Sequence, residues 1–123
     1  MKQDPDTLAL KPFNFNQILE EVPELRKFGC KIDTYSFDPL IDSSDVQPDF
    51  WLKLTSLIKE NYDKYDGFVI LHGTDTMSFT ASALSFMFEN LAKPVVLTGS
   101  QLPIGMLRTD GKENLISSIE IAS

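Results

Sequence analysis

The 123 residues of this chain, of which 42% are hydrophobic and 24% charged, have the size and composition of one globular domain. Eighteen acidic against eleven basic residues give a formal net charge of -7, which argues against nucleic acid or an anionic membrane surface as a partner. No apolar run approaches the roughly 20 residues of a membrane helix, and the start lacks the apolar stretch of a secretory signal. The single cysteine, Cys30, excludes an internal disulfide and a cysteine-based zinc site, and it fits a reducing cytoplasm.

The first predicted elements are a helix, a strand and a loop. Apolar residues at helical spacing predict a helix over Asn16–Phe28, in which Pro23 lies near a first turn or imposes a break. Alternation of side chains predicts a strand over Cys30–Phe37. The turn-rich stretch "DPLIDSSDVQP" that follows is expected to be a loop.

The rest of the chain alternates helices with short apolar strands. An apolar stripe predicts a helix over Asp49–Tyr65, with Pro48 at its start. The further elements expected are a strand at Asp66–Leu71, a helix at Ser78–Ala92 that is buried on more than one side, a strand at Pro94–Gly99 and a helix from about Lys112 to Ala122. Apolar strands separated by helices are typical of a parallel sheet covered on both faces. The expected fold is therefore α/β, an open three-layer sandwich of Rossmann-like type with the order βαβαβα.

Three polar loops follow the predicted strands, at Asp42–Asp45, His72–Met77 and Thr98–Gln101. In parallel sheets, ligands bind at the carboxyl ends of the strands, where such loops lead into helices. However, Thr, Asp and Ser are also the preferred helix N-caps, and "TDT" or "DSSD" alone is more often a cap than a catalytic site. A lone His72 is likewise more often a packed histidine, and Gly73 is explained by a tight turn. Composition and spacing do not decide between these interpretations.

Two longer motifs carry a resemblance to a known family. "HGTDTM" at His72–Met77 and "KPVVLTGSQLPIGMLRTDGKENL" at Lys93–Leu115 closely resemble the L-asparaginases. Within that family, "TGSQLP" and "RTDG..NL" resemble the cytoplasmic type I branch. The resemblance extends back through Ile41–Leu54 and covers roughly residues 25 to 123.

This resemblance implies hydrolysis of L-asparagine to L-aspartate and ammonia, without a metal or organic cofactor. It implies that Thr74 belongs to a Thr, Asp, Lys constellation that activates a nucleophile, that Thr74 and Asp75 are the catalytic residues, and that Asp75 also binds the substrate's α-amino group. Ser43 corresponds to the serine that holds the α-carboxylate, and Ser44 to a substrate-contacting polar residue. These roles suit a zwitterionic substrate, because it needs an anion for its ammonium group and neutral donors for its carboxylate. A threonine hydroxyl also needs a base, such as a neutral lysine.

Two parts of the family pattern are not found in these 123 residues. The family carries a first catalytic threonine in a "GGT" loop, and no such loop precedes Phe13. The lysine of the second constellation is expected beyond the last helix, and neither Lys93 nor Lys112 is a candidate. We therefore expect residues 1–123 to be a single partial α/β domain, the middle of an asparaginase N-terminal domain without the C-terminal domain, and to be inactive alone. Its exposed apolar edges favour self-association, so a homo-oligomer is expected.

Two other functions stay open at this point. The chain could be a non-catalytic module for amino-acid binding or protein interaction, or an asparaginase-like subunit of a tRNA-dependent amidotransferase, since such subunits share loops like "HGTDTM". Arg108 and Asp110, taken alone, are best explained as a surface ion pair and a helix cap. By resemblance to the type I branch, the segment Ser100–Asn114 orders the surroundings of the pocket instead of contacting substrate.

Overall fold

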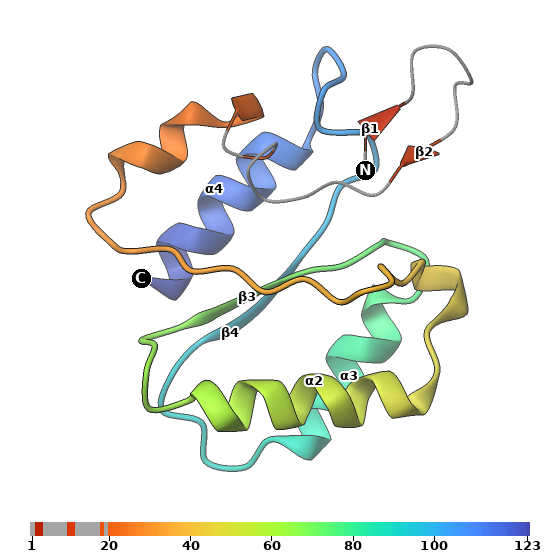
Figure 1. The fold of residues 1–123 in the computed structure, drawn as a ribbon, viewed down its shortest axis with the longest axis vertical. Coiled ribbons are helices and arrows are strands. Elements are labelled where there is room, and N and C mark those ends of the chain that lie inside the picture. The colour runs from red at the N-terminus through yellow and green to blue at the C-terminus, as the bar shows by residue number, and fades with distance from the viewer. Residues whose placement is uncertain (1, 4–9, 12–17, 19) are drawn as a thin grey trace.

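A two-stranded parallel sheet lies at the centre of the protein (Figure 1). The computed structural model describes residues 2–3, 10–11, 18 and 20–123. Strands β3 (Phe68–Leu71) and β4 (Val95–Thr98) pair with Val69 opposite Val96. The other elements are the antiparallel pair β1 (Lys2–Gln3) and β2 (Leu10–Lys11), the 3-10 helices η1 (Pro23–Lys27) and η2 (Ser43–Asp45), and the α-helices α2 (Pro48–Asn61), α3 (Met77–Met87) and α4 (Gly111–Ala122).

Helices cover both faces of this sheet. Figure 1 shows α4 above β3 and β4, and α2 with α3 below them. Successive side chains of a strand point to opposite faces, so β3 contributes to two separate cores. Val69 packs against a buried cluster formed by residues of α4, of η1 and of the segment that precedes η1. Ile70 belongs to a second buried cluster, with residues of α2 and α3. The predicted α/β class and its layers are confirmed.

The predicted strand at Cys30–Phe37 is wrong, because this segment is extended but makes no ladder to β3. It is held by side chains instead. The Tyr65 hydroxyl donates to the Asp33 carboxylate over 3.1 Å, and the Phe37 ring lies 5.3 Å from that of Phe50. Ile32 and Phe37 are the half-buried residues of this segment, and they pack against different cores, Ile32 against the first cluster and Phe37 against the second. The parallel sheet therefore has two strands among the described residues, where three were expected.

The predicted helix over Asn16–Phe28 is divided at Pro23. Ile18, Glu20 and Glu21 are helical, Val22 is not, and Pro23 opens the 3-10 helix η1; residues 16, 17 and 19 lie outside the described residues. Proline lacks the N–H that would continue an α-helix, and its fixed φ suits a first helical position. The break that the sequence allowed is the observed arrangement.

The helices α2 and α4 agree with prediction, whereas α3 differs in length and burial. Pro48 opens α2 as expected, although α2 ends at Asn61. Helix α3 ends at Met87 instead of Ala92, and the N–H groups of Ala92 and Lys93 donate to the Tyr62 hydroxyl outside it. Expected burial on more than one side is wrong.

On α3 the outward face is open to solvent. Phe79 is 64% exposed and Phe86 is 87% exposed, while Thr80 and Leu84 are buried. Among the described residues no element packs over that face, because the small sheet lies on the opposite side. None of the helices in the described ranges is long and apolar enough to cross a membrane.

Candidate functional site

The loop that contains η2 meets the loop between β3 and α3, and a serine and an aspartate are in contact there. Ser43 is buried, and its hydroxyl donates to Oδ2 of Asp75 over 3.2 Å. The Thr76 hydroxyl donates to the carbonyl oxygen of Ser43 over 2.6 Å. These two bonds join segments more than 30 residues apart and bring Ser43 and Asp75 into contact.

Gly73 allows this close approach. A Cβ atom at position 73 would lie 2.3 Å from the Ser43 Oγ and 2.6 Å from the Ser43 Cβ. Its backbone φ is not positive, so the tight-turn interpretation does not account for this glycine. A residue without a side chain is needed because the two loops touch at this point.

The helix-cap interpretation fails for "TDT" and holds in part for "DSSD". Thr76 occupies the N-cap position of α3, but its side chain makes no capping bond and contacts Ser43 instead. In contrast, Oδ1 of Asp42 accepts from the N–H and the hydroxyl of Ser44, over 3.0 and 2.9 Å. The bond from the Ser44 N–H, followed by the bond from its hydroxyl, lowers the pKa of Asp42. Ser44 is exposed and held by Asp42, so the structure does not bring it to Asp75.

Thr74 faces a different part of the same end of the sheet. It is exposed and lines a groove of about 490 Å³ with residues from β4, the loop after it and α4, among them Gly99, Asp110 and Asn114. Ser43 and Asp75 do not line this groove. Thr74 and Asp75 are adjacent in one loop but have different neighbours: Asp75 contacts Ser43 in η2, and Thr74 lines the groove beside β4.

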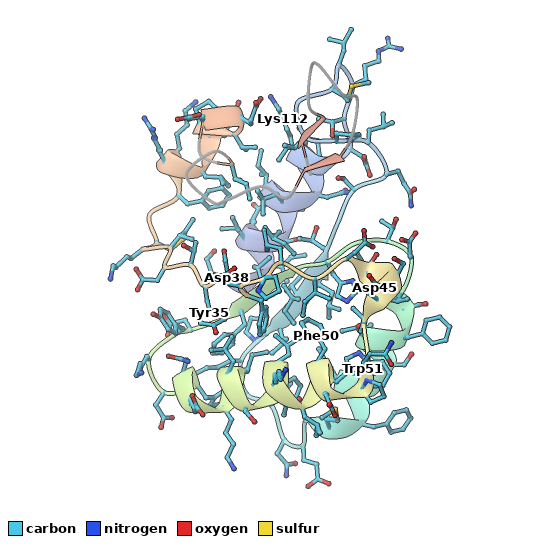
Figure 2. All side chains as sticks on the ribbon, turned by 45° about the vertical axis from the view of Figure 1, so that its right-hand side comes forward. Tyr35, Asp38, Asp45, Phe50, Trp51 and Lys112 are labelled. Atoms are coloured by element: carbon cyan, nitrogen blue, oxygen red, sulfur yellow. The ribbon has the colours of Figure 1, made fainter. Side chains whose placement is uncertain are left out.

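Lys93 and Lys112, which were not expected to be the base for Thr74, both lie outside the groove that Thr74 lines. Lys93 precedes β4 and lies at the opposite end of that strand from Thr98; its ammonium group donates to the Tyr62 carbonyl and lies 4.9 Å from the Tyr62 ring centroid. Lys112 lies in the first turn of α4 (Figure 2) and does not line the groove. No lysine is among the groove residues.

Asp110 holds the loop that follows β4. Its carboxylate accepts from the backbone N–H of Gln101 over 3.1 and 3.0 Å, from that of Leu102 over 3.1 Å and from the Asn114 amide over 3.2 Å. Asn114 also donates to the Gly99 carbonyl. The side chain of Asp110 does not form the predicted cap of α4. Within the part of the chain that the structure describes, Asp110 also forms no ion pair with Arg108. The carboxylate is used by the loop instead.

The Asp110 contacts predict a pH dependence of stability. The N–H groups of Gln101 and, next, Leu102 lower the pKa of Asp110 below its ordinary value. A lowered folded-state pKa means stability that is present above the unfolded pKa and is lost as the pH falls through the folded pKa. At pH values below about 4, the melting temperature should therefore decrease as the pH is lowered. This decrease should be less steep in Asp110→Asn than in the wild type. Equal slopes in the two proteins would contradict this role of Asp110.

His72 is a packed, hydrogen-bonded histidine, which is the more common role of a lone histidine. Its Nδ1 lies 2.7 Å from the Gly73 carbonyl oxygen and its Nε2 lies 2.9 Å from the Thr80 hydroxyl. Trp51 and Thr80, which complete this arrangement, were not predicted as site residues. A polar residue in the middle of the apolar stretch of α3 was the available signal for Thr80.

The described ranges contain no group of three or more His, Cys, Asp or Glu residues that could hold a metal ion. The fold is that of an α/β domain with polar loops at the carboxyl ends of its two parallel strands, the end at which such sheets bind ligands. The model of the family "Asparaginase, N-terminal" matches residues 1–123. The chain therefore belongs to the asparaginase family.

Relatives and a solved structure agree with this assignment. L-asparaginase 1 of Escherichia coli (strain K12) is 57% identical over 101 residues, which are 82% of this chain and 29% of that protein. A glutamyl-tRNA(Gln) amidotransferase subunit of Metallosphaera sedula is 37% identical over 123 residues, covering 98% of this chain and 28% of the relative. The crystal structure of L-asparaginase I from Vibrio cholerae matches with a TM-score of 0.80 and 53% identity, over 89% of this chain and 34% of that one. The chain thus spans about a third or less of these proteins.

Proposed function

We propose that the protein containing this chain hydrolyses L-asparagine to L-aspartate and ammonia. The observation that carries this proposal is the contact between the Ser43 hydroxyl and the Asp75 carboxylate, next to Thr74 in the same loop. By family resemblance, these are the groups for the substrate's α-carboxylate, its α-amino group and its amide. The identity with E. coli L-asparaginase 1 over most of this chain supports the same reaction.

The contact between Ser43 and Asp75 is suited to a zwitterion. Asp75 offers a carboxylate for the α-ammonium group, and a charge-assisted bond to it is among the stronger polar contacts in proteins. The Ser43 hydroxyl, which donates to Asp75 in this structure, rotates to donate to the α-carboxylate when substrate is present. Each group thus satisfies the other in the free site and the substrate in the complex. Ser43 is buried, and the Thr76 hydroxyl bonds its carbonyl oxygen. The fold therefore sets the distance between the hydroxyl that meets the substrate's carboxylate and the Asp75 carboxylate that meets its ammonium group.

Thr74 is the proposed catalytic hydroxyl, and it requires a base. Residues 1–123 are proposed to form part of an asparaginase N-terminal domain, with the lysine base and the first threonine supplied from outside them. These residues alone are therefore proposed to be inactive. We further propose a homo-oligomer in the cytoplasm, acting on a small molecule and not on nucleic acid or a membrane. The net charge of -7 and the single, exposed Cys30 support that setting.

The proposal is tested by ammonia release from the full-length protein. L-asparagine should be hydrolysed with a higher kcat/KM than L-glutamine, with no added metal or organic cofactor. Binding of L-asparagine in calorimetry with no ammonia formed would instead favour a non-catalytic amino-acid-binding module.

A second candidate is the glutamine-hydrolysing subunit of a tRNA-dependent amidotransferase. The 37% identity to the amidotransferase subunit of Metallosphaera sedula, over 98% of this chain, favours it, although the identity is lower than to E. coli L-asparaginase 1. Such a subunit would release ammonia from L-glutamine mainly in the presence of its partner subunit and tRNA. Hydrolysis of L-asparagine by the protein alone would exclude this function.

Asp75→Asn should chiefly weaken substrate capture. The change keeps the shape of the side chain but removes the charge that meets the substrate's ammonium group, so KM should rise about tenfold or more while kcat falls less. Steady-state kinetics on L-asparagine measures both constants. Asp45→Asn is the matched control, because Asp45 lies at the exposed end of η2 (Figure 2) and should leave both unchanged. An unchanged KM in Asp75→Asn would remove Asp75 from the substrate site.

A further inference from the structure

Three side chains, from α2, α3 and the loop after β3, form a hydrogen-bonded series that ends beside Thr74. The indole Nε1 of Trp51 on α2 donates to the Thr80 hydroxyl on α3 over 3.0 Å. That hydroxyl lies 2.9 Å from Nε2 of His72, which follows β3. The other ring nitrogen of His72 lies 2.7 Å from the carbonyl oxygen of Gly73.

The donors and acceptors of this series fix where the protons lie. A carbonyl oxygen only accepts, so Nδ1 of His72 must carry a proton to bond Gly73. In a neutral imidazole Nε2 is then unprotonated and accepts the single proton of the Thr80 hydroxyl. The indole N–H of Trp51 only donates, and Thr80 has a free lone pair for it. Every donor and acceptor is used once when His72 is the neutral Nδ1–H tautomer.

The end of the series orients the peptide that leads into Thr74. The Gly73 carbonyl belongs to the peptide bond between Gly73 and Thr74, and in a trans peptide the C=O and the N–H point in opposite directions. By holding this carbonyl, His72 directs the N–H of Thr74 away from its own ring. Thr80 is fully buried and the Phe50 ring lies 6.1 Å from that of His72, so the imidazole is enclosed on more than one side. Figure 2 shows Phe50 between α2 and the sheet.

We infer that Trp51, Thr80 and His72 are positioning residues that hold the Gly73–Thr74 peptide in place, so that Thr74 is correctly placed for its part in catalysis. The inference rests on the proposed amide hydrolysis, but the hydrogen-bonded series itself is a property of the fold. It acts on Thr74 and not on Asp75, because Asp75 is held separately by Ser43. Loss of the series should therefore affect turnover more than substrate capture.

Kinetics of the full-length protein tests this split. Thr80→Val keeps the shape and removes the hydroxyl, so kcat should fall about tenfold or more while KM changes by less than about threefold, since small misplacements of reacting groups cost much rate. Thr80→Ser restores the hydroxyl and should recover most of kcat. Trp51→Phe, which removes the indole N–H and keeps an aromatic ring, should give a smaller loss. Ser82→Ala, on the exposed side of α3, is the control. Equal kcat in Thr80→Val and Thr80→Ser would overturn the inference.

The proton positions are tested without any reaction. In full-length protein labelled with ¹⁵N-histidine, the neutral form of His72, assigned with His72→Gln, should be the Nδ1–H tautomer. Thr80→Val should shift its Nε2 resonance, and Thr80→Ser should restore it. The opposite tautomer in the wild type would overturn the inference. If the labelled protein shows the predicted tautomer but no amide is hydrolysed, the proposed function fails while the hydrogen-bonded series stands.

Discussion

Thr74→Val should abolish hydrolysis of L-asparagine by the full-length protein, with kcat reduced on the order of a thousandfold or more, because removal of one member of a catalytic set removes most of its rate. Stability should change by no more than about 0.5 kcal/mol, since Thr74 is exposed and its hydroxyl bonds no described residue. Ammonia release and thermal unfolding measure the two quantities on the same preparation.

Thr74→Ser is the matched control for this loss, since it keeps a hydroxyl at the same position. It should retain substantially more activity than Thr74→Val, and calorimetry should show that Thr74→Val still binds L-asparagine through Ser43 and Asp75. Residual turnover near the wild-type value in Thr74→Val would show that Thr74 is not the proposed catalytic hydroxyl.

Gly73→Ala should damage the proposed substrate site and the fold together. The added Cβ would meet the Ser43 Oγ at 2.3 Å and the Ser43 Cβ at 2.6 Å, and rotation of the hydroxyl relieves only the first contact. The two loops must therefore move apart, which breaks the bond between Ser43 and Asp75. Overpacking of this kind typically costs about 1–3 kcal/mol of unfolding free energy. We expect a lower melting temperature and a KM for L-asparagine raised by about tenfold or more.

Gly29→Ala is the control for the glycine substitution, because a Cβ at position 29 meets nothing within 4 Å. It should leave both the melting temperature and KM near the wild-type values. A Gly73→Ala protein with wild-type KM and stability would mean that the approach of Ser43 to Gly73 is not required.

Local pattern in the sequence was sufficient for β3, β4, α2 and α4, although not for the length and burial of α3. The runs that became β3 and β4 are apolar because both faces of the sheet are covered, and the stripe on α2 buries Leu54 and Ile58. The segment Cys30–Phe37 has a strand-like alternation, but Phe37 packs on Phe50 without a backbone ladder. The alternation of residue types shows neither which side chains are buried, since Tyr35 is 65% exposed, nor whether a neighbouring strand is bonded.

The candidate site was predicted through resemblance and not through physical pattern. Nothing within "HGTDTM" shows that Thr76 bonds the Ser43 carbonyl instead of capping α3, because the choice depends on a loop more than 30 residues away. Gly73 was explained by a turn for the same reason, whereas its neighbour in space is Ser43. Contacts between distant segments decided these roles, so local propensity pointed to the wrong partner.

Three hydrogen bonds between segments far apart in the sequence also have a consequence for folding. Asp33 with Tyr65, Ser43 with Asp75, and Trp51 with Thr80 each close a loop of similar length, with separations of 32, 32 and 29 residues. The entropy lost on closing a loop grows only with the logarithm of its length, and overlapping loops share most of that loss. Once one of these bonds has formed, the others join groups that are already near one another. We therefore expect the contact between Ser43 and Asp75 to form together with the docking of α2 on α3.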